Sequence, residues 1–423
     1  MRNIFITMLL VILAVLLIIA PAWAQQSGAL GAWQNPDIGF AYDLKFDMHN
    51  ADVDDDGNQI WKTRGFHIST AELSIGAELD PYARIDFNAM FSREGAEIHE
   101  LFVTGHSLPM SFKARLGQYL ASFGRWNQFH SHSMPFASEP RILQEYFGGH
   151  LMSTGLEMSW LAPTDHYFEV IGTVLNGIEG HTHDTDPMSS FAEYGPGNPP
   201  PGCHFHDGEL HCPDDPELAE LYNLTSGDPD APMAPGANKG FKDMAWLGRV
   251  QTSVEMGLDW SIDLGTSLVY QDAWRYSQRF AGKTYSKSTF GVDITVFWNP
   301  VEKNLYQGMD FGIEYMRNRQ GNEIQVEDNW VEHTYNSDGA FAYARYRLNR
   351  TWEFGAYVED FAPAESNERR NRVGGFLTWN ISHYQRIRLE YVKDDRGFFE
   401  DDVDQVILQF DGVIGYHTHG RQR

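Results

Sequence analysis

Histidine and carboxylate side chains are concentrated in one polar segment, residues 177–243, and these side chains are common ligands of zinc. The candidate ligands are His181, His183, His204, His206, His211 and Asp207. Histidines spaced as His-x-His in a mobile loop can converge on one ion. The segment therefore predicts either a zinc site or a group of solvated polar side chains. Zinc affinity would fall below about pH 6.5, where the imidazoles take up protons.

The two cysteines of the chain, Cys203 and Cys212, flank this histidine stretch. In the oxidising compartment expected for an exported protein, two nearby thiols favour a disulfide over thiolate ligation of zinc. We therefore expect a Cys203–Cys212 disulfide that closes a small loop and leaves the histidines free to bind a metal. One such bond in 423 residues does not hold the fold together.

A second acidic motif lies earlier in the chain. Its carboxylate and amide side chains stand at alternate positions, as at the front of a calcium-binding loop, and are Asp52, Asp54, Asp56 and Asn58. Position twelve of the motif is Thr63, where a calcium loop has a bidentate glutamate, and no helices are expected on its flanks. Both a calcium site and a charged loop that keeps neighbouring molecules apart fit this pattern.

The elements that must carry these segments are β-strands. Between residues 70 and 91, apolar side chains alternate with polar ones through two runs separated by Asp80-Pro81. Successive side chains of a strand point to opposite faces, so each run has one apolar and one polar face. The same alternation recurs along the chain, which indicates an all-β transmembrane barrel with lipid outside and water inside.

The beginning of the chain predicts export. Arg2, the apolar run 4–20 and the small-x-small sequence Ala22-Trp23-Ala24 have the order of a secretory signal peptide, residues 1–24. A membrane-anchoring helix is the alternative for this run. With a barrel expected over residues 25–423, the predicted location is the bacterial outer membrane.

The number of strands follows from the spacing of the alternating runs. We expect about 16 strands (a range of 14–18), joined alternately by short periplasmic turns and long extracellular loops, which is the rhythm of outer-membrane barrels. The predicted strands are 37–49, 65–79, 82–92, 97–105, 111–118, 153–161, 166–176, 244–256, 259–271, 286–299, 307–318, 338–349, 351–360, 370–381, 384–394 and 403–416.

The polar faces of these strands carry charges of both signs, and charged rings tune the selectivity of a channel. The predicted pore-lining residues are Glu72, Arg84, Asp86, Lys113, Arg115, Arg249, Arg345, Arg347, Arg386 and Arg388. The formal net charge of −26 and the acidic outer loops favour cations at the mouth. Basic residues meeting at one level would favour anions instead, and pairing of opposite charges across the wall is the structural alternative.

The connection 119–152 is a candidate constriction loop, because it is long and follows the fifth predicted strand. It carries Arg125, His130 and His132. A barrel of sixteen strands is wide enough to leave an aqueous channel, which a loop folded into it would narrow. An exposed outer loop is the equally open alternative.

Three stretches of the chain resemble a group of proteobacterial porin-like proteins. They are Gly117–Leu120 with Phe123–His132 and Pro135-Phe136, then Ser159–Thr164, then the ending Gln409–His417. Some members of the group are described as zinc-regulated outer-membrane proteins, and the group is related in fold to the phosphate-selective porins. The resemblance implies a barrel porin with a connection to zinc. The chain departs from outer-membrane barrels that end in an aromatic residue, since it continues to Arg423.

Several functions remain open from the sequence. A channel for passive diffusion of small solutes or ions, gathering divalent metal at its mouth, is the first. A surface metal-binding protein anchored by its barrel and an anion- or phosphate-selective porin are the alternatives. Neither a Gly-x-Ser-x-Gly nor a His-Glu-x-x-His motif occurs, so no enzyme is expected.

The expected partners are outer-membrane lipids, lipopolysaccharide, small solutes or metal ions, and no nucleic acid. Trimers are common among related porins. No cofactor is required, although zinc or calcium could bind in the outer loops.

Overall fold

The computed structural model describes residues 36–50, 65–92, 95–106, 108–178, 180–181, 204–206, 209–211, 240–277, 283–302, 307–326, 329–366, 368–395 and 402–416. Among these residues, no helix is long and apolar enough to cross a membrane. The signal peptide 1–24, the acidic motif at 52–58, both cysteines, His183 and Asp207 lie outside the described residues.

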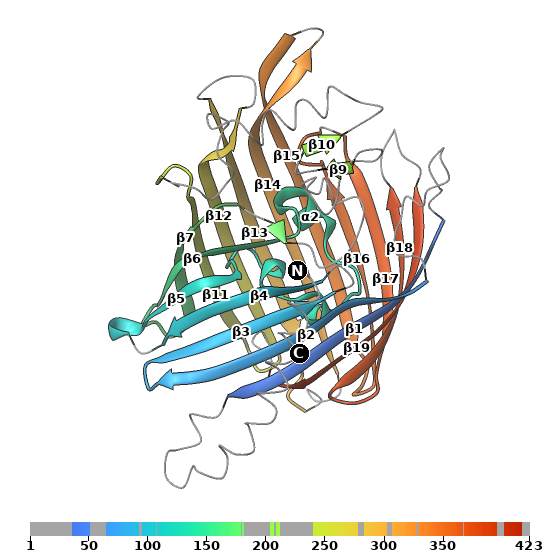
Figure 1. Cartoon of the computed structure of the whole chain (residues 1–423). Coiled ribbons are helices and arrows are strands. Elements are labelled where there is room, and N and C mark those ends of the chain that lie inside the picture. The colour runs from blue at the N-terminus through green and yellow to red at the C-terminus, as the bar shows by residue number, and fades with distance from the viewer. Residues whose placement is uncertain are drawn as a thin grey trace.

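Sixteen antiparallel strands form a closed barrel, which confirms the predicted fold class (Figure 1). The strands are β1 (Asp37–His49), β2 (Gly65–Asp80), β3 (Ala83–Phe91), β4 (Ala96–Gly105), β5 (Phe112–Leu120), β6 (His150–Leu161), β7 (Tyr167–Leu175), β11 (Ala245–Met256), β12 (Trp260–Tyr276), β13 (Thr284–Trp298), β14 (Gly308–Val326), β15 (Asn329–Arg347), β16 (Trp352–Phe361), β17 (Arg370–Asn380), β18 (Gln385–Asp395) and β19 (Val403–Gly415). Consecutive strands pair with each other. Pairing of β1 with β19, from Gly39 opposite Gly415 to His49 opposite Gln405, closes the ring.

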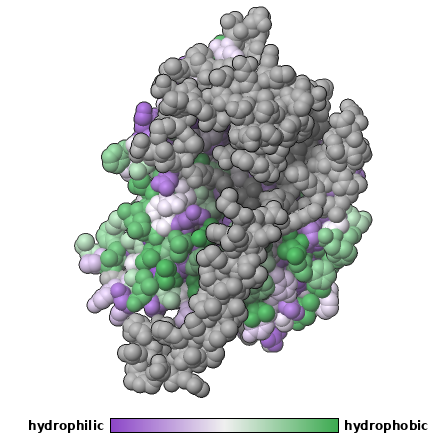
Figure 2. Space-filling view, viewed as in Figure 1, coloured by the Kyte–Doolittle hydropathy of each residue, from purple (hydrophilic) through white to green (hydrophobic). Residues whose placement is uncertain are grey.

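Polar side chains line the inside of the barrel and apolar side chains cover its outside. On β1 and β2, Asp43 and Glu72 are fully buried, whereas Leu44 is 40% exposed. This distribution is the reverse of a water-soluble protein and is what a barrel surrounded by lipid requires. Figure 2 shows apolar side chains gathered on the outer flank of the molecule.

Aromatic side chains mark the end of the barrel where the short turns lie. Trp260 and Trp298 stand opposite each other beside two of these turns, with ring centroids 6.3 Å apart. Trp352 and Trp379 do the same on β16 and β17, where their rings stack at 6.1 Å. Tryptophan prefers the boundary between lipid and water, so these pairs define one edge of the membrane-spanning band.

The segment 121–149, which we call the lumen loop, connects β5 to β6 and lies within the ring of strands (Figure 1). It contains the short helices η3 (Trp126–Gln128), η4 (Ser131–Ser133) and α2 (Arg141–Phe147). Most of its side chains are buried. Of the two arrangements left open by the sequence, the structure has the loop folded inward.

Two predicted outer connections, 272–285 and 319–337, are shorter than predicted, because the strands on their flanks extend into them. Strand β12 continues to Tyr276, and β14 and β15 pair without interruption from Gly308–Arg347 to Val326–Asn329. Polar residues predominate in the outer parts of β14 and β15, so the alternation that identified the membrane-spanning parts is missing there, although the backbone pairing continues. The lumen loop is also shorter than predicted at both ends, because β5 reaches Leu120 and β6 begins at His150.

Candidate functional site

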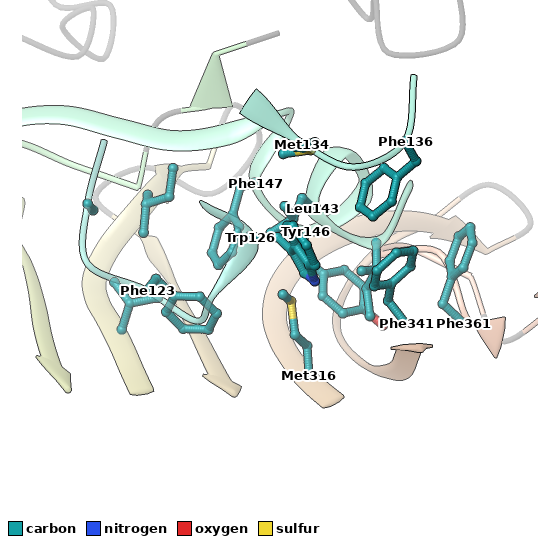
Figure 3. Close-up of a cluster of buried hydrophobic side chains, with 14 of the residues drawn as sticks. Phe123, Trp126, Met134, Phe136, Leu143, Tyr146, Phe147, Met316, Phe341 and Phe361 are labelled. Atoms are coloured by element: carbon teal, nitrogen blue, oxygen red, sulfur yellow. The ribbon is translucent and has the colours of Figure 1, made fainter. Parts of the chain in front are cut away.

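Aromatic side chains fasten the lumen loop to one side of the barrel wall (Figure 3). The ring of Trp126 lies 4.9 Å from that of Tyr343 and 6.0 Å from that of Phe341, both on β15. Phe136 lies 5.2 Å from Phe341 and 5.4 Å from Tyr357 on β16. These contacts bury large apolar areas inside a barrel whose lining is otherwise polar, so the loop is a packed part of the structure.

Charged side chains of β18 bind the backbone of the same part of the loop. Arg386 and Arg388 each donate to the carbonyl oxygen of Met134, at 3.1 Å in both cases. Glu390 accepts a hydrogen bond of 2.6 Å from the backbone N–H of Ala137. These wall charges therefore satisfy loop groups that would otherwise be buried without a partner.

A third set of contacts holds the beginning of the loop. The carboxylate of Glu314 on β14 accepts from the backbone N–H groups of Arg125 at 3.2 Å and Trp126 at 3.3 Å. Gly124 has a φ of +56°, and a Cβ there would lie 1.7 Å from Glu314 Oε1. The glycine thus permits both the left-handed turn and the close approach to the wall.

Across the barrel, the loop meets a cluster of histidine and glutamate side chains from β2 and β4. His130 Nδ1 lies 2.6 Å from Glu72 Oε2, and His130 Nε2 lies 3.2 Å from Glu100 Oε2. The His99 ring contacts that of His130 edge-on at 4.7 Å, and the His132 ring lies 5.5 Å from it. We call these five residues, all of them buried, the histidine–glutamate cluster.

A β-bulge in β4 brings two consecutive side chains into this cluster. The pairing with β3 shifts between Ala89–Ile98 and Asn88–Glu100, so His99 has no opposite residue on β3. Both His99 and Glu100 are then buried on the inside, where a regular strand would turn one of them to the lipid. A strand predicted with strict two-residue alternation cannot include two consecutive inward-facing side chains, so the sequence analysis did not predict this bulge.

The two glutamates of the cluster lie beside both ring nitrogens of His130, at 2.6 Å from Nδ1 and 3.2 Å from Nε2. Hydrogen bonds in which one partner is ionised are stronger than those between neutral groups. The cluster ties the middle of the loop to β2 and β4, opposite the aromatic contacts.

Most of the predicted pore-lining cations form ion pairs with acids along the wall. Arg249 lies 2.7 Å from Asp293, Arg345 lies 2.9 Å from Asp310, and Arg115 lies 3.0 Å from Glu157. Arg84 lies 3.0 Å from Asp86, and Arg386 lies 2.6 Å from Asp411. Lys113 stands on the same face as Arg115, and Arg347 donates to Asn299. From the lumen loop, Arg125 reaches Asp263 at 3.4 Å.

The predicted metal ligands of the segment 177–243 are placed by their backbone only. Strands β9 (His204–His206) and β10 (Glu209–His211) form a small antiparallel ladder in which His204 stands opposite His211. His181 belongs to β8 (Gly180–His181) and pairs with His150 of β6. The ladder of β9 and β10 is therefore a separate sheet, whereas β8 belongs to the sheet of the barrel through its pairing with β6.

Sequence reasoning named His130 and His132 but not Glu100, which contacts His130. It also did not connect Glu314 and Glu390 with the backbone of the loop. All three glutamates lie on expected strands, where they resemble ordinary polar positions. The available signal was the adjacent pair His99-Glu100, because two consecutive polar side chains on a membrane-facing strand indicate a bulge. The partners of the loop depend on its path across the barrel, which no local pattern contains.

These features define a class. A closed sixteen-stranded barrel with an apolar outer belt, a charged polar lining and an inward-folded loop after the fifth strand is an outer-membrane β-barrel of the porin fold. No protein-family model matches the chain. An uncharacterized protein of Aquifex aeolicus is 24% identical over 380 residues, which cover 84% of this chain and 70% of that protein.

Solved structures with the same fold include an outer membrane channel and an anion-selective porin. Pseudomonas putida OprB has a TM-score of 0.52 at 10% identity, covering 90% of this chain and 94% of its own. The outer membrane channel DcaP of Acinetobacter baumannii has a TM-score of 0.50 at 11% identity, with coverages of 90% and 96%. The anion-selective porin from Comamonas acidovorans has a TM-score of 0.50 at 10% identity, with coverages of 90% and 99%.

Proposed function

We propose that this protein is a passive diffusion channel for small solutes or ions in the outer membrane. The observation that supports it is the lumen loop, which crosses a wide polar barrel and is held from both sides by Trp126, Glu390 and His130. A barrel that served only as an anchor would not need a built constriction. Swelling of proteoliposomes in isotonic solutions of small uncharged solutes tests the proposal, and swelling no faster than that of protein-free liposomes would reject it.

A preference for cations is the finer part of the proposal. Acidic side chains outnumber basic ones on the inward face of the described strands, and Asp43, Asp47 and Glu72 gather on β1 and β2. A negative lining raises the local concentration of cations. In a planar bilayer with a salt gradient, the reversal potential should take the sign of a cation-selective channel.

An anion preference is the second candidate, and one observation favours it. Arg388 bonds to neutral groups, Thr378, Gln409 and the Met134 carbonyl, beside Arg386. A cation of the lining that binds neutral groups raises the local concentration of anions. A reversal potential of the opposite sign, which moves toward zero in Arg388→Gln, would select this alternative, including a phosphate-selective form of it.

A separate proposal is that the protein gathers zinc at the mouth of the barrel. It would do so either as a channel or as a metal-binding protein anchored by its barrel. Its support is the pairing of His204 with His211 and the resemblance to zinc-regulated outer-membrane proteins. Replacing His181, His183, His204, His206 and His211 together with glutamine should reduce zinc binding by the purified protein while leaving solute flux intact. Unchanged zinc binding would remove the outer segment from the proposal.

The remaining expectations concern assembly and the outer loops. A homotrimer, a Cys203–Cys212 disulfide and calcium at Asp52, Asp54, Asp56 and Asn58 stay predictions. Light scattering of the detergent complex gives the oligomeric state, thiol titration of the unfolded protein counts the free cysteines, and calcium binding by Asp54→Asn tests the acidic motif.

A further inference from the structure

The histidine–glutamate cluster has the composition of a transition-metal site, and it is separate from the outer segment 177–243. Its side chains come from three places in the sequence: Glu72 on β2, His99 and Glu100 on β4, and His130 and His132 on the lumen loop. Within it, ligand atoms of Glu72, His130 and His132 lie within 4.8 Å of one another. All three side chains are at most 1% exposed.

We propose that Glu72, His130 and His132 bind one divalent transition-metal ion of the zinc type inside the barrel. Two imidazoles and one carboxylate are a common set of three protein ligands, with a fourth position left for water or a solute.

The distances between the ligand atoms are close to those that zinc requires. Ligands at 2.0–2.1 Å from a tetrahedral ion stand about 3.3 Å apart. Glu72 Oε2 lies 2.6 Å from His130 Nδ1 and 4.0 Å from His132 Nδ1. One separation must widen and the other must shorten by about 0.7 Å to reach that spacing.

The surroundings of the three ligands match those of metal sites. A metal-bound histidine usually donates its second ring N–H to a carboxylate, which fixes the ring and strengthens the ligand. His130 Nε2 meets Glu100 Oε2 at 3.2 Å, and Glu100 is itself held by Asn88 at 2.9 Å. The other oxygen of Glu72 accepts from the Ser74 hydroxyl at 3.1 Å. Glu72 and His130 are therefore oriented before an ion arrives.

Such an ion would tether the lumen loop to the wall. Two of its ligands belong to the loop and one to β2, opposite the aromatic contacts of Trp126 and Phe136. Metal binding would then fix the loop on its second side. The ion would then have a structural function in the barrel and no catalytic one.

The test uses the full-length protein in detergent, with His181, His183, His204, His206 and His211 already changed to glutamine. This protein should bind one Zn²⁺ in competition with a chromophoric chelator. His132→Gln in addition should weaken binding by about tenfold or more, and Glu100→Gln by about 10–100-fold. His166→Gln is the matched control, because His166 is exposed in the turn between β6 and β7. No zinc bound by the parent protein would overturn the proposal.

The position of the ion is tested by anomalous diffraction from crystals grown with Zn²⁺. The proposal expects a peak about 2.0–2.2 Å from Glu72, His130 Nδ1 and His132 Nδ1. A peak between His99 and Glu100 would overturn the assignment of ligands. If a variant shows altered mobility on unheated gels, and so has not folded, the anomalous map of the parent protein still decides the proposal.

Discussion

At the scale of single residues, the lining of this barrel is organised by buried ion pairs. Arg345 and Asp310, on β15 and β14, are almost fully buried and lie 2.9 Å apart. A buried charge that loses its partner keeps its desolvation cost, so such pairs are sensitive to removal of either member. Exposed pairs, such as Arg369 with Asp338, carry little of this dependence.

Asp310→Asn should therefore lower the free energy of unfolding by up to about 3–5 kcal/mol, since it leaves the buried Arg345 guanidinium with the more distant Glu353, at 3.6 Å, as its acidic partner. Asp338→Asn, the control, should cost less than about 1 kcal/mol. Urea unfolding of both variants in lipid vesicles measures the difference. Equal losses in the two variants would mean that the pair inside the barrel is solvated.

At this scale, the sequence predicted which side chains face inward but not which side chains they contact. The alternation around residues 70–91 identified Glu72, Arg84 and Asp86 as inward-facing. When the apolar side chains of a strand face the lipid, the residues between them must face the inside of the barrel. The alternation could not identify their partners. The contact of Glu72 with His130 joins residues 58 positions apart, and it exists only because the lumen loop turns inward.

At the scale of elements, the lumen loop is the feature that separates this barrel from a simple tube. Its first turn depends on Gly124, whose φ is +56° and whose position leaves no room for a Cβ beside Glu314. Gly257, in the turn between β11 and β12, has a similar φ of +74° but nothing within 4 Å of an added Cβ. Alanine substitutions at these two glycines therefore distinguish the effect of backbone strain from that of the contact with Glu314.

Gly124→Ala should displace the start of the loop and expose its arginines, whereas Gly257→Ala should leave the loop in place. Limited trypsin digestion of the folded protein measures this, because Arg125 and Arg141 are cleavage sites within the loop. Faster cleavage in Gly124→Ala alone is the expected result. Cleavage of the Gly257→Ala loop at the same rate would show that general strain, and not the contact with Glu314, is responsible.

The strands themselves could be predicted because lipid and water impose a period of two on each of them. The outer parts of β14 and β15 were missed, since polar residues predominate in them and no regular alternation remains. The inward path of the loop could not be derived from its sequence alone. Trp126 and Phe136 are apolar enough for an inward position, but a lipid or protein contact would require the same side chains.

At the scale of the whole molecule, the protein is a barrel with a polar inside and an apolar outside. Val358 on β16 faces outward at 50% exposure, six residues from the tryptophan at the barrel edge. Phe66 faces outward near the opposite end of β2. The depth of each position in the membrane should decide what a charge costs there.

Val358→Arg should destabilise the folded protein by about 2–4 kcal/mol, because it places a charge near the middle of the bilayer. Phe66→Arg should cost about 0–1 kcal/mol, since that position lies near the water. Reversible folding into vesicles measures both values. A larger cost at Phe66 than at Val358 would contradict this placement of the barrel in the membrane.

The central claim is that the barrel conducts through a lumen narrowed by its loop, and single-channel recording tests it most directly. The folded protein in a planar bilayer should give discrete conductance steps. Trp126→Ala, which removes the aromatic contacts of the loop, should give larger steps, whereas Trp352→Ala on the lipid side should not. Absence of steps from the folded wild-type protein, or identical steps from all three proteins, would contradict a conducting lumen narrowed by the loop.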